Sequence, residues 1–229
     1  MDQRTYNQYC ATARTLDIVG ERWTLLLVRE LLTGPKRFVD LQQSLPGLGT
    51  GLLAARLKHL VREGLVDKVT LPPPARVPAY ALTEAGEELE AAVLALARWG
   101  LRWAMGPRRD GETFLPGWAV LGVKALFDAD AATGVHGVYE FRVGRDVFHV
   151  RVDDGAIDTV LGPAERPDVT VAATDDFFVA MTERALTLME AIDQGSATVS
   201  GDRRALEQLS ALIRLPEPSA RREPTQDRA

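Results

Sequence analysis

The side chains of this sequence best suited to bind a charged partner gather in one short stretch, GTGLLAARLKHLVREGL, at residues 49–65. This stretch holds two arginines, a lysine and a histidine, although the whole chain has a formal net charge of −5. Cationic side chains on one element are suited to binding the phosphates of a nucleic acid, and a few of them can also contact base edges. Whether they form one surface depends on the element that carries them.

At about 100° per residue, residues 49–65 predict a helix with two different faces. One face is apolar, and we expect it to bury Leu53, Leu57, Leu60, Val61 and Gly64. The opposite side carries Ala55, Lys58, His59 and Arg62, with Arg56 on the flank. Thr50 is placed to cap this helix and Gly64 to end it. The alternative is an ordinary amphipathic helix whose basic side is only solvated.

Two helices are predicted before this one. Residues 13–34 carry an apolar stripe at helical spacing that is interrupted by Glu30, and Gly34-Pro35 ends it. The stripe consists of Leu16, Val19, Trp23, Leu26, Leu27 and Leu31. A shorter helix is expected over 37–45, with Phe38, Leu41 and Leu45 facing inward.

A hairpin and a long helix are predicted after it. Residues 64–71 and 79–83 are typical of two strands, and the prolines of PPPARVP between them favour a stiff, exposed tip. Thr83 is placed to cap a long helix over 84–105. This order of elements is that of a winged helix-turn-helix, in which the basic helix recognises double-stranded DNA and the hairpin is the wing. The predicted DNA-binding residues are Lys36, Arg37, Thr50, Ala55, Arg56, Lys58, His59, Arg62 and Arg76.

Residues 8–103 resemble the HxlR-type winged-helix regulators. The segments that carry the resemblance follow Cys10 in order: GERW, GPKRF, LPG, LLAARLKHL, GLV and YALTEAG. The resemblance implies a homodimeric transcription regulator. A two-fold dimer is expected to bind inverted-repeat DNA, and repression is the default, since a bound winged helix can occlude the polymerase. An apolar stripe on 84–105 agrees with a dimer, since it exceeds what a small domain hides, although packing on the second domain would also cover it.

Cys10 has two interpretations. A cysteine is often a small buried apolar residue, but some HxlR-type regulators use the matching cysteine as a thiol sensor. Cys10 is therefore a redox candidate, and it is the only cysteine of the chain, which excludes an intrachain disulfide.

The second half of the chain predicts an α+β domain. A linker at 106–114 precedes a helix, an antiparallel meander ending in DDG, a strand in PDVTVAAT, a helical segment, the strand ATVSG and a last helix. Residues 115–215 are similar to the sterol-carrier-protein-like domain, which implies an apolar tunnel for a small hydrophobic ligand. The candidate ligand-binding residues are Phe141, Phe148, Phe177, Phe178, Met181, Leu186, Met189 and Ile192, and the alternative is that they are plain core.

The fold class is thus α+β, with a winged helix-turn-helix domain at 1–105, a ligand domain at 115–215 and a disordered tail at 216–229. We expect no enzyme, no cofactor and no metal site, since the three histidines lie far apart and no HExxH, GxSxG, GxGxxG or P-loop pattern occurs. No apolar run is long enough to span a membrane and no signal peptide is present, so a cytoplasmic location is expected. Two alternatives stay open: a lipid carrier whose winged helix serves dimerisation alone, and a redox sensor acting through Cys10.

Overall fold

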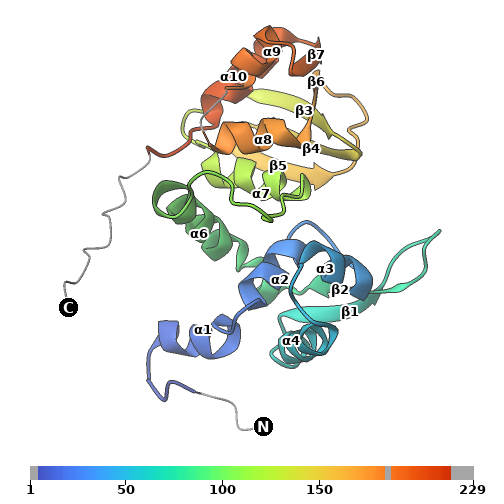
Figure 1. The fold of residues 1–229 in the computed structure, drawn as a ribbon, viewed down its shortest axis with the longest axis vertical. Helices are drawn as coiled ribbons and strands as arrows, with labels where there is room; N and C mark the ends of the chain where they lie inside the picture. The colour runs from blue at the N-terminus through green and yellow to red at the C-terminus, as the bar shows by residue number, and fades with distance from the viewer. Residues whose placement is uncertain (1–4, 184–186, 218–229) are drawn as a thin grey trace. The chain divides into compact units, whose positions relative to one another are not determined.

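The computed structural model describes residues 5–183 and 187–217, and the chain divides into two compact units within residues 1–93 and 94–229 (Figure 1). Leu186 and the predicted tail from residue 218 onward lie outside the described residues. Each unit has its own apolar core. The N-terminal unit begins with four helices: α1 (Ala11–Val19), α2 (Thr24–Leu31), α3 (Phe38–Ser44) and α4 (Thr50–Arg62).

The single long helix predicted over 13–34 is wrong, because it is broken between α1 and α2. The Gly20 N–H still bonds to the Leu16 carbonyl at 2.9 Å, but Trp23 then adopts a left-handed conformation with φ of 77°. A helix cannot continue through such a residue. Leu16 and Leu26 consequently remain exposed instead of sharing one buried stripe.

Helix α4 buries the apolar face that its sequence spacing predicts, but its two ends differ from the prediction. Leu53, Leu57 and Leu60 belong to the N-terminal core. Gly64 is exposed, not buried, and ends the helix with a φ of +73°, a conformation that glycine adopts without strain. Thr50 is not the cap: it is the first helical residue, and Gly49 precedes it as an extended N-cap.

The wing is present as predicted. Strands β1 (Val66–Thr70) and β2 (Pro78–Leu82) pair antiparallel, with Val66 opposite Leu82. Two backbone hydrogen bonds of 3.0 and 2.8 Å join Lys36 and Tyr80, so the segment that leads into α3 is tied to the wing.

The long helix predicted over 84–105 is divided into α5 (Glu84–Glu87) and α6 (Glu90–Trp103). The cap is confirmed, because the Thr83 hydroxyl accepts a hydrogen bond from the Gly86 N–H at 3.2 Å. The two compact units divide within α6, after Val93.

The C-terminal unit is a five-stranded sheet with helices. Its elements are α7 (Gly117–Leu126), β3 (His136–Val143), β4 (Asp146–Asp153), β5 (Ala156–Leu161), β6 (Val169–Ala173), α8 (Asp175–Thr182), α9 (Leu188–Asp193), β7 (Ala197–Gly201) and α10 (Arg203–Leu212). The predicted α+β class is confirmed. Tyr139, Phe141 and Val143 project from one face of the sheet into a core shared with the helices.

The strand order is β5-β4-β3-β6-β7, and the sheet is mixed, not wholly antiparallel as predicted. β3, β4 and β5 form the expected antiparallel meander, but β6 pairs parallel to β3, with Phe141 opposite Val171. The reason is the connection after β5, which crosses the sheet over residues 162–168 and places β6 on the far side of β3.

A buried carboxylate fastens this crossing segment to the sheet. Glu140 is 1% exposed and lies opposite His149 on the sheet face away from Phe141. Its Oε2 accepts from the Ala164 N–H at 2.9 Å, its Oε1 accepts from Arg142 Nε at 2.7 Å, and His149 Nδ1 lies 3.0 Å from the Gly162 carbonyl. Burial raises the pKa of Glu140, but the hydrogen bonds from Arg142 and Ala164 outweigh it, so its pKa lies below its ordinary value.

Replacing Glu140 with glutamine is expected to lower the free energy of unfolding of the C-terminal unit by about 1–3 kcal/mol at neutral pH. A carboxyl whose pKa is depressed on folding stabilises the fold above its unfolded pKa, and that contribution disappears as the pH falls through the folded pKa. The wild type should therefore lose stability more steeply than E140Q below about pH 5. Urea unfolding across pH measures this, and parallel acid limbs for the two proteins would contradict it.

Candidate nucleic-acid interface and ligand cavity

Helix α4 has three stripes along its length, because residues three and four positions apart share a side. The first is the buried leucine stripe described above. The second consists of Arg56, His59 and Glu63, whose polar atoms meet one another or the α1 region. The third consists of Ala55, Lys58 and Arg62, all exposed.

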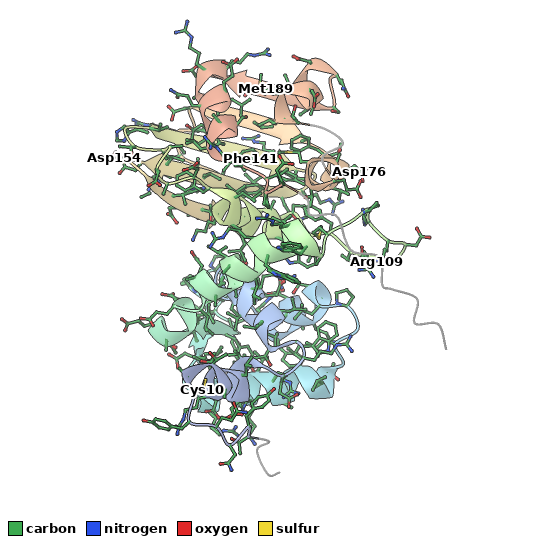
Figure 2. All side chains as sticks on the ribbon, turned by 90° about the vertical axis from the view of Figure 1, so that its left-hand side faces the viewer. Cys10, Arg109, Phe141, Asp154, Asp176 and Met189 are labelled. Atoms are coloured by element: carbon green, nitrogen blue, oxygen red, sulfur yellow. The ribbon has the colours of Figure 1, made fainter. Side chains whose placement is uncertain are left out.

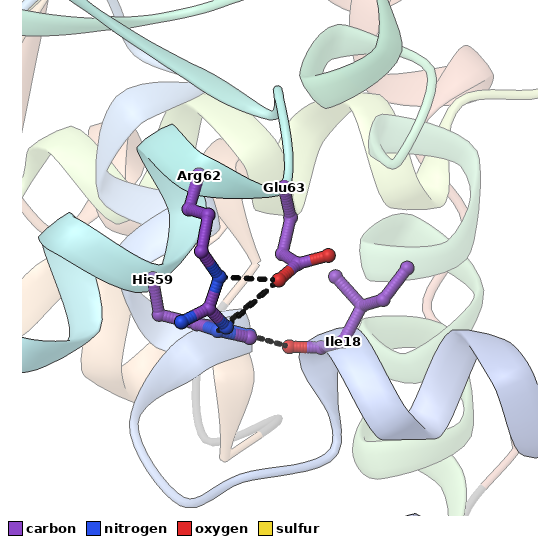
Figure 3. Close-up of polar contacts among 4 residues, drawn as sticks. All are labelled: Ile18, His59, Arg62 and Glu63. Carbon is purple, nitrogen blue, oxygen red and sulfur yellow. Dashed lines mark hydrogen bonds and ion pairs between the residues drawn. The ribbon is translucent and has the colours of Figure 1, made fainter. Parts of the chain in front are cut away.

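The second stripe holds α4 to the end of α1. His59 Nε2 lies 2.9 Å from the Ile18 carbonyl oxygen (Figure 3). Arg56 pairs with Glu21, just after α1, at 2.8 Å. Arg62 lies 2.8 Å from His59 Nδ1 and 2.8 Å from Glu63 Oε1. Because the guanidinium can only donate, Nδ1 accepts, and the ring proton is assigned to Nε2, which donates to Ile18. His59 and Arg56 therefore face α1, whereas the sequence predicted them for the DNA-binding side or its flank.

Replacing His59 with alanine is expected to destabilise the N-terminal unit by about 1–3 kcal/mol, since the Ile18 carbonyl loses its donor. The slope of DNA affinity against salt concentration should stay unchanged, because His59 is not on the exposed stripe. Chemical unfolding and a salt titration of DNA binding measure the two quantities. A slope that falls by about one unit would instead indicate that His59 itself contacts a phosphate.

The other predicted DNA-binding residues are more scattered. Thr50 is exposed at the start of α4, and Arg76 is exposed at the wing tip with a φ of 43°. Arg37 forms a two-pronged contact with Asp40, at 2.8 and 2.6 Å, which raises the pKa of the guanidinium and lowers that of the carboxyl. Lys36 is half-buried, and burial lowers its pKa. The structure thus groups Thr50, Ala55, Lys58 and Arg62 on α4 and leaves the remaining cations apart or paired.

The sequence prediction omitted two exposed small residues, Gly51 and Ala54, beside the third stripe. Their place on the helical wheel was the available signal, but neither residue carries a charge that would mark it as part of a binding surface. Small residues let a helix approach a partner closely, so they belong with the candidate interface.

Cys10 is exposed at the N-cap of α1 (Figure 2), so the interpretation as a buried apolar residue is wrong. The backbone N–H groups of Ala13 and Thr12 lower the pKa of the thiol. A lowered pKa makes a thiol more reactive, and the role of Cys10 as a redox sensor stays a prediction.

A cavity of about 410 Å³ lies in the C-terminal unit. It is lined from β3, α7, α8, α9 and α10 and the segments beside them, and Figure 2 labels Phe141 and Met189 among its walls. Five of the predicted ligand-binding residues line it: Phe141, Phe177, Phe178, Met181 and Met189. Phe148 and Ile192 do not. Phe148 stacks beneath Phe141 with ring centres 5.0 Å apart, and Ile192 packs against the core.

Much of the cavity wall escaped the sequence prediction. Phe114, Trp118, Gly122 and Val123 line it from α7 or just before, and Leu209, Ser210 and Ile213 from the last helix and just after it. One signal for these residues was available in the sequence: residues 115–129 are apolar on nearly all sides of the predicted helix. A helix that only packs one face against a sheet needs a single apolar face. Nothing in the sequence distinguishes a packed helix from one that leaves a space.

Within the described ranges, no three His, Cys, Asp or Glu side chains cluster as metal ligands would. In the same ranges, no helix has the length and apolar character needed to cross a membrane.

The comparisons with known proteins match two successive segments of the chain. The HxlR-like helix-turn-helix family matches residues 18–107, and the SCP-2 sterol transfer family matches residues 123–214. An HTH-type transcriptional regulator of Mycobacterium tuberculosis is 42% identical over 101 residues, covering 44% of this chain and 62% of the relative. The chain thus spans less than two thirds of that relative's length.

Other relatives are covered more fully. The HTH-type transcriptional regulator YvaP of Bacillus subtilis is 35% identical over 91 residues, which are 39% of this chain and 83% of YvaP. Among solved structures, the reduced form of the transcriptional regulator YodB from B. subtilis is 31% identical and has a TM-score of 0.36. That match covers 41% of this chain and 92% of the YodB chain.

Proposed function

The chain belongs to the HxlR-like helix-turn-helix family through residues 18–107 and carries an SCP-2 family domain at residues 123–214, and from this premise we propose that it is a DNA-binding transcriptional regulator. We propose further that it acts as a homodimer on an inverted-repeat site. Repression is the simplest outcome, because a winged helix bound at a promoter blocks the polymerase without other contacts.

The observation that carries the proposal is the exposed stripe of α4. Ala55, Lys58 and Arg62 share one side of the helix that follows α3 and precedes the wing, the position of a recognition helix. A small side chain followed by two cations on one side of a helix suits a groove, where the helix must approach closely and phosphates lie nearby. Arg62 also contacts Glu63, but its side chain stays 61% exposed, whereas Lys36 is half-buried and lies outside α4.

Exposed apolar residues support the dimer. Leu96, Trp99 and Trp103 on α6 are 53%, 59% and 46% exposed in the single chain. Large apolar side chains gathered on one helix mark a surface for association, and most homodimers use the same patch twice. A two-fold dimer of this kind would meet half-sites whose centres lie about 34 Å apart.

The test is a titration of the DNA upstream of the protein's own gene with the full chain, by fluorescence anisotropy at about 50 and about 200 mM salt. Specific binding that survives excess unrelated DNA is expected, with affinity falling steeply between the two salt concentrations. Sedimentation of the complex measures its stoichiometry. Binding no tighter than to unrelated DNA of the same length would contradict the proposal.

The cavity favours a second role within the same protein. A space of about 410 Å³ with mainly apolar walls is typical of a small-molecule site. We propose that a hydrophobic ligand in this cavity modulates DNA binding, which requires the ligand to bind the DNA-competent and DNA-incompetent states with different affinity.

The competing function is a carrier of hydrophobic ligands in which the winged helix serves dimerisation alone. The two functions differ in what they require of α4. A regulator loses its function when the exposed cations of α4 are removed, whereas a carrier keeps ligand binding and has no DNA binding to lose.

A further inference from the structure

Aromatic side chains make up a large part of the cavity wall. Phe178 lies 5.1 Å from Phe177, 6.3 Å from Phe114 and 6.4 Å from Phe141, measured between ring centres. Trp118 meets Phe114 edge-on at 6.4 Å. Rings of this kind attract a further aromatic ring through stacked and edge-to-face contacts, beyond the effect of apolar burial. An extended aliphatic chain gains only the burial.

Among the residues that the structure describes, the cavity wall is also uncharged, since none of the 18 that line it is acidic or basic. Two arginines, Arg98 and Arg214, line a separate groove of about 360 Å³ that shares Leu126 with the cavity. Arg98 donates to the Ala125 carbonyl at 3.3 Å, and Arg214 pairs with Asp128 at 3.4 Å. An anionic group inside the cavity would lose its hydration without gaining a cation, which disfavours carboxylates.

Three of the described residues that line the cavity carry a hydroxyl group, and these groups differ in their partners. Thr182 donates to the Phe178 carbonyl at 2.8 Å, and Thr187 contacts Glu190 at 2.8 Å. The Oγ of Ser210 is buried and has no hydrogen-bond partner among the residues that the structure describes. A buried hydroxyl without a partner is destabilising, so a ligand atom that completes its hydrogen bond would gain affinity and selectivity.

We propose that the cavity binds a neutral, flat aromatic molecule with one hydroxyl group, and that this group bonds to Ser210. The inference rests on the proposed role of the cavity as a ligand site and is independent of DNA binding. Ser210 is thereby the residue that selects a hydroxylated aromatic over the bare hydrocarbon.

The experiment measures binding to the full chain, without DNA, of three probes that share one three-ring skeleton: 9-phenanthrol, phenanthrene and phenanthrene-9-carboxylate. Probe fluorescence reports the dissociation constants, and oleate and cholesterol are tested as competitors. 9-Phenanthrol should bind about tenfold more tightly than phenanthrene, as one hydrogen bond to an otherwise unpaired hydroxyl predicts. The carboxylate, oleate and cholesterol should bind more weakly than 9-phenanthrol.

Variant S210A should remove the tenfold preference and leave phenanthrene binding unchanged, because alanine keeps the helix and the apolar wall. The matched control is S196A, whose hydroxyl donates to the Ala191 carbonyl at 3.1 Å and does not line the cavity. It should keep the preference. Equal binding of 9-phenanthrol and phenanthrene, or a preference that survives in S210A, would overturn the inference.

The remaining outcomes separate this inference from the proposed function. Tighter binding of oleate or cholesterol than of 9-phenanthrol would overturn the aromatic class and leave the cavity a ligand site. Failure of every probe and competitor to bind would overturn both. Failure of the wild-type chain to bind DNA in the separate titration would contradict the proposed regulator but not the proposed ligand of the cavity.

Discussion

Replacing Lys58 and Arg62 together with alanine is expected to weaken DNA binding by at least about 30-fold while the fold persists. Both side chains lie on the exposed stripe of α4, where neither is needed for the core. Each lost phosphate contact should also reduce the slope of log affinity against log salt by about one unit. Anisotropy titrations at several salt concentrations measure both effects.

The control is a double variant with the same change in net charge, Arg145→Ala with Arg151→Ala, at exposed positions in the C-terminal unit. It should retain the affinity and the salt slope of the wild type. Circular dichroism and thermal unfolding exclude misfolding, which matters because Arg62 also contacts His59 and Glu63. An α4 variant that binds DNA as tightly as the control would mean that another surface carries the contact.

Replacing Gly122 with leucine is expected to abolish ligand binding and to raise the free energy of unfolding by about 1–2 kcal/mol. Gly122 lies within α7 and lines the cavity, and a Cβ at this position would meet no atom of the described residues within 4 Å. The leucine side chain would therefore occupy space that is otherwise open to a ligand. Thermal unfolding and probe titration measure the two effects, and DNA binding in the absence of ligand should not change.

The matched control is Gly122→Ala, which supplies the same gain in helix propensity, about 0.5–1 kcal/mol, and leaves most of the cavity open. It should be stabilised and still bind the probes. If Gly122→Leu bound every wild-type ligand with undiminished affinity, the cavity would not be the binding site.

The order of the elements was predictable from the sequence because it depends on local signals. Gly64, Thr83 and the prolines of the wing mark boundaries that the structure contains, and the leucines of α4 identify its buried face. The break between α1 and α2 was not predictable in the same way. Trp23 has no intrinsic preference for a left-handed conformation, so only the packing of the unit accounts for it.

The candidate DNA-binding side was only partly predictable, since a helical wheel separates apolar from polar residues and nothing more. Arg56 and His59 lie on the polar side of the helical wheel as Lys58 does, but His59 contacts the end of α1 and Arg56 contacts Glu21 just after it. The cavity was harder still to predict. Its walls come from segments as far apart as Phe114 and Ser210, and only the fold brings them together.

The crossing segment between β5 and β6 also bears on the order in which the C-terminal unit assembles. In the meander, Phe141 pairs with Phe148 across one tight turn, whereas Phe141 and Val171 pair only after β4, β5 and the crossing segment have been traversed. Pairings between near neighbours in the chain close small loops and form fastest. We therefore expect the meander to form first and β6 to join late, when the segment tethered by Glu140 has closed over the sheet. The slow step in the refolding of this unit should then be the docking of the crossing segment and β6. A substitution at Glu140 should change the rate of this docking step more than the rate at which the meander forms.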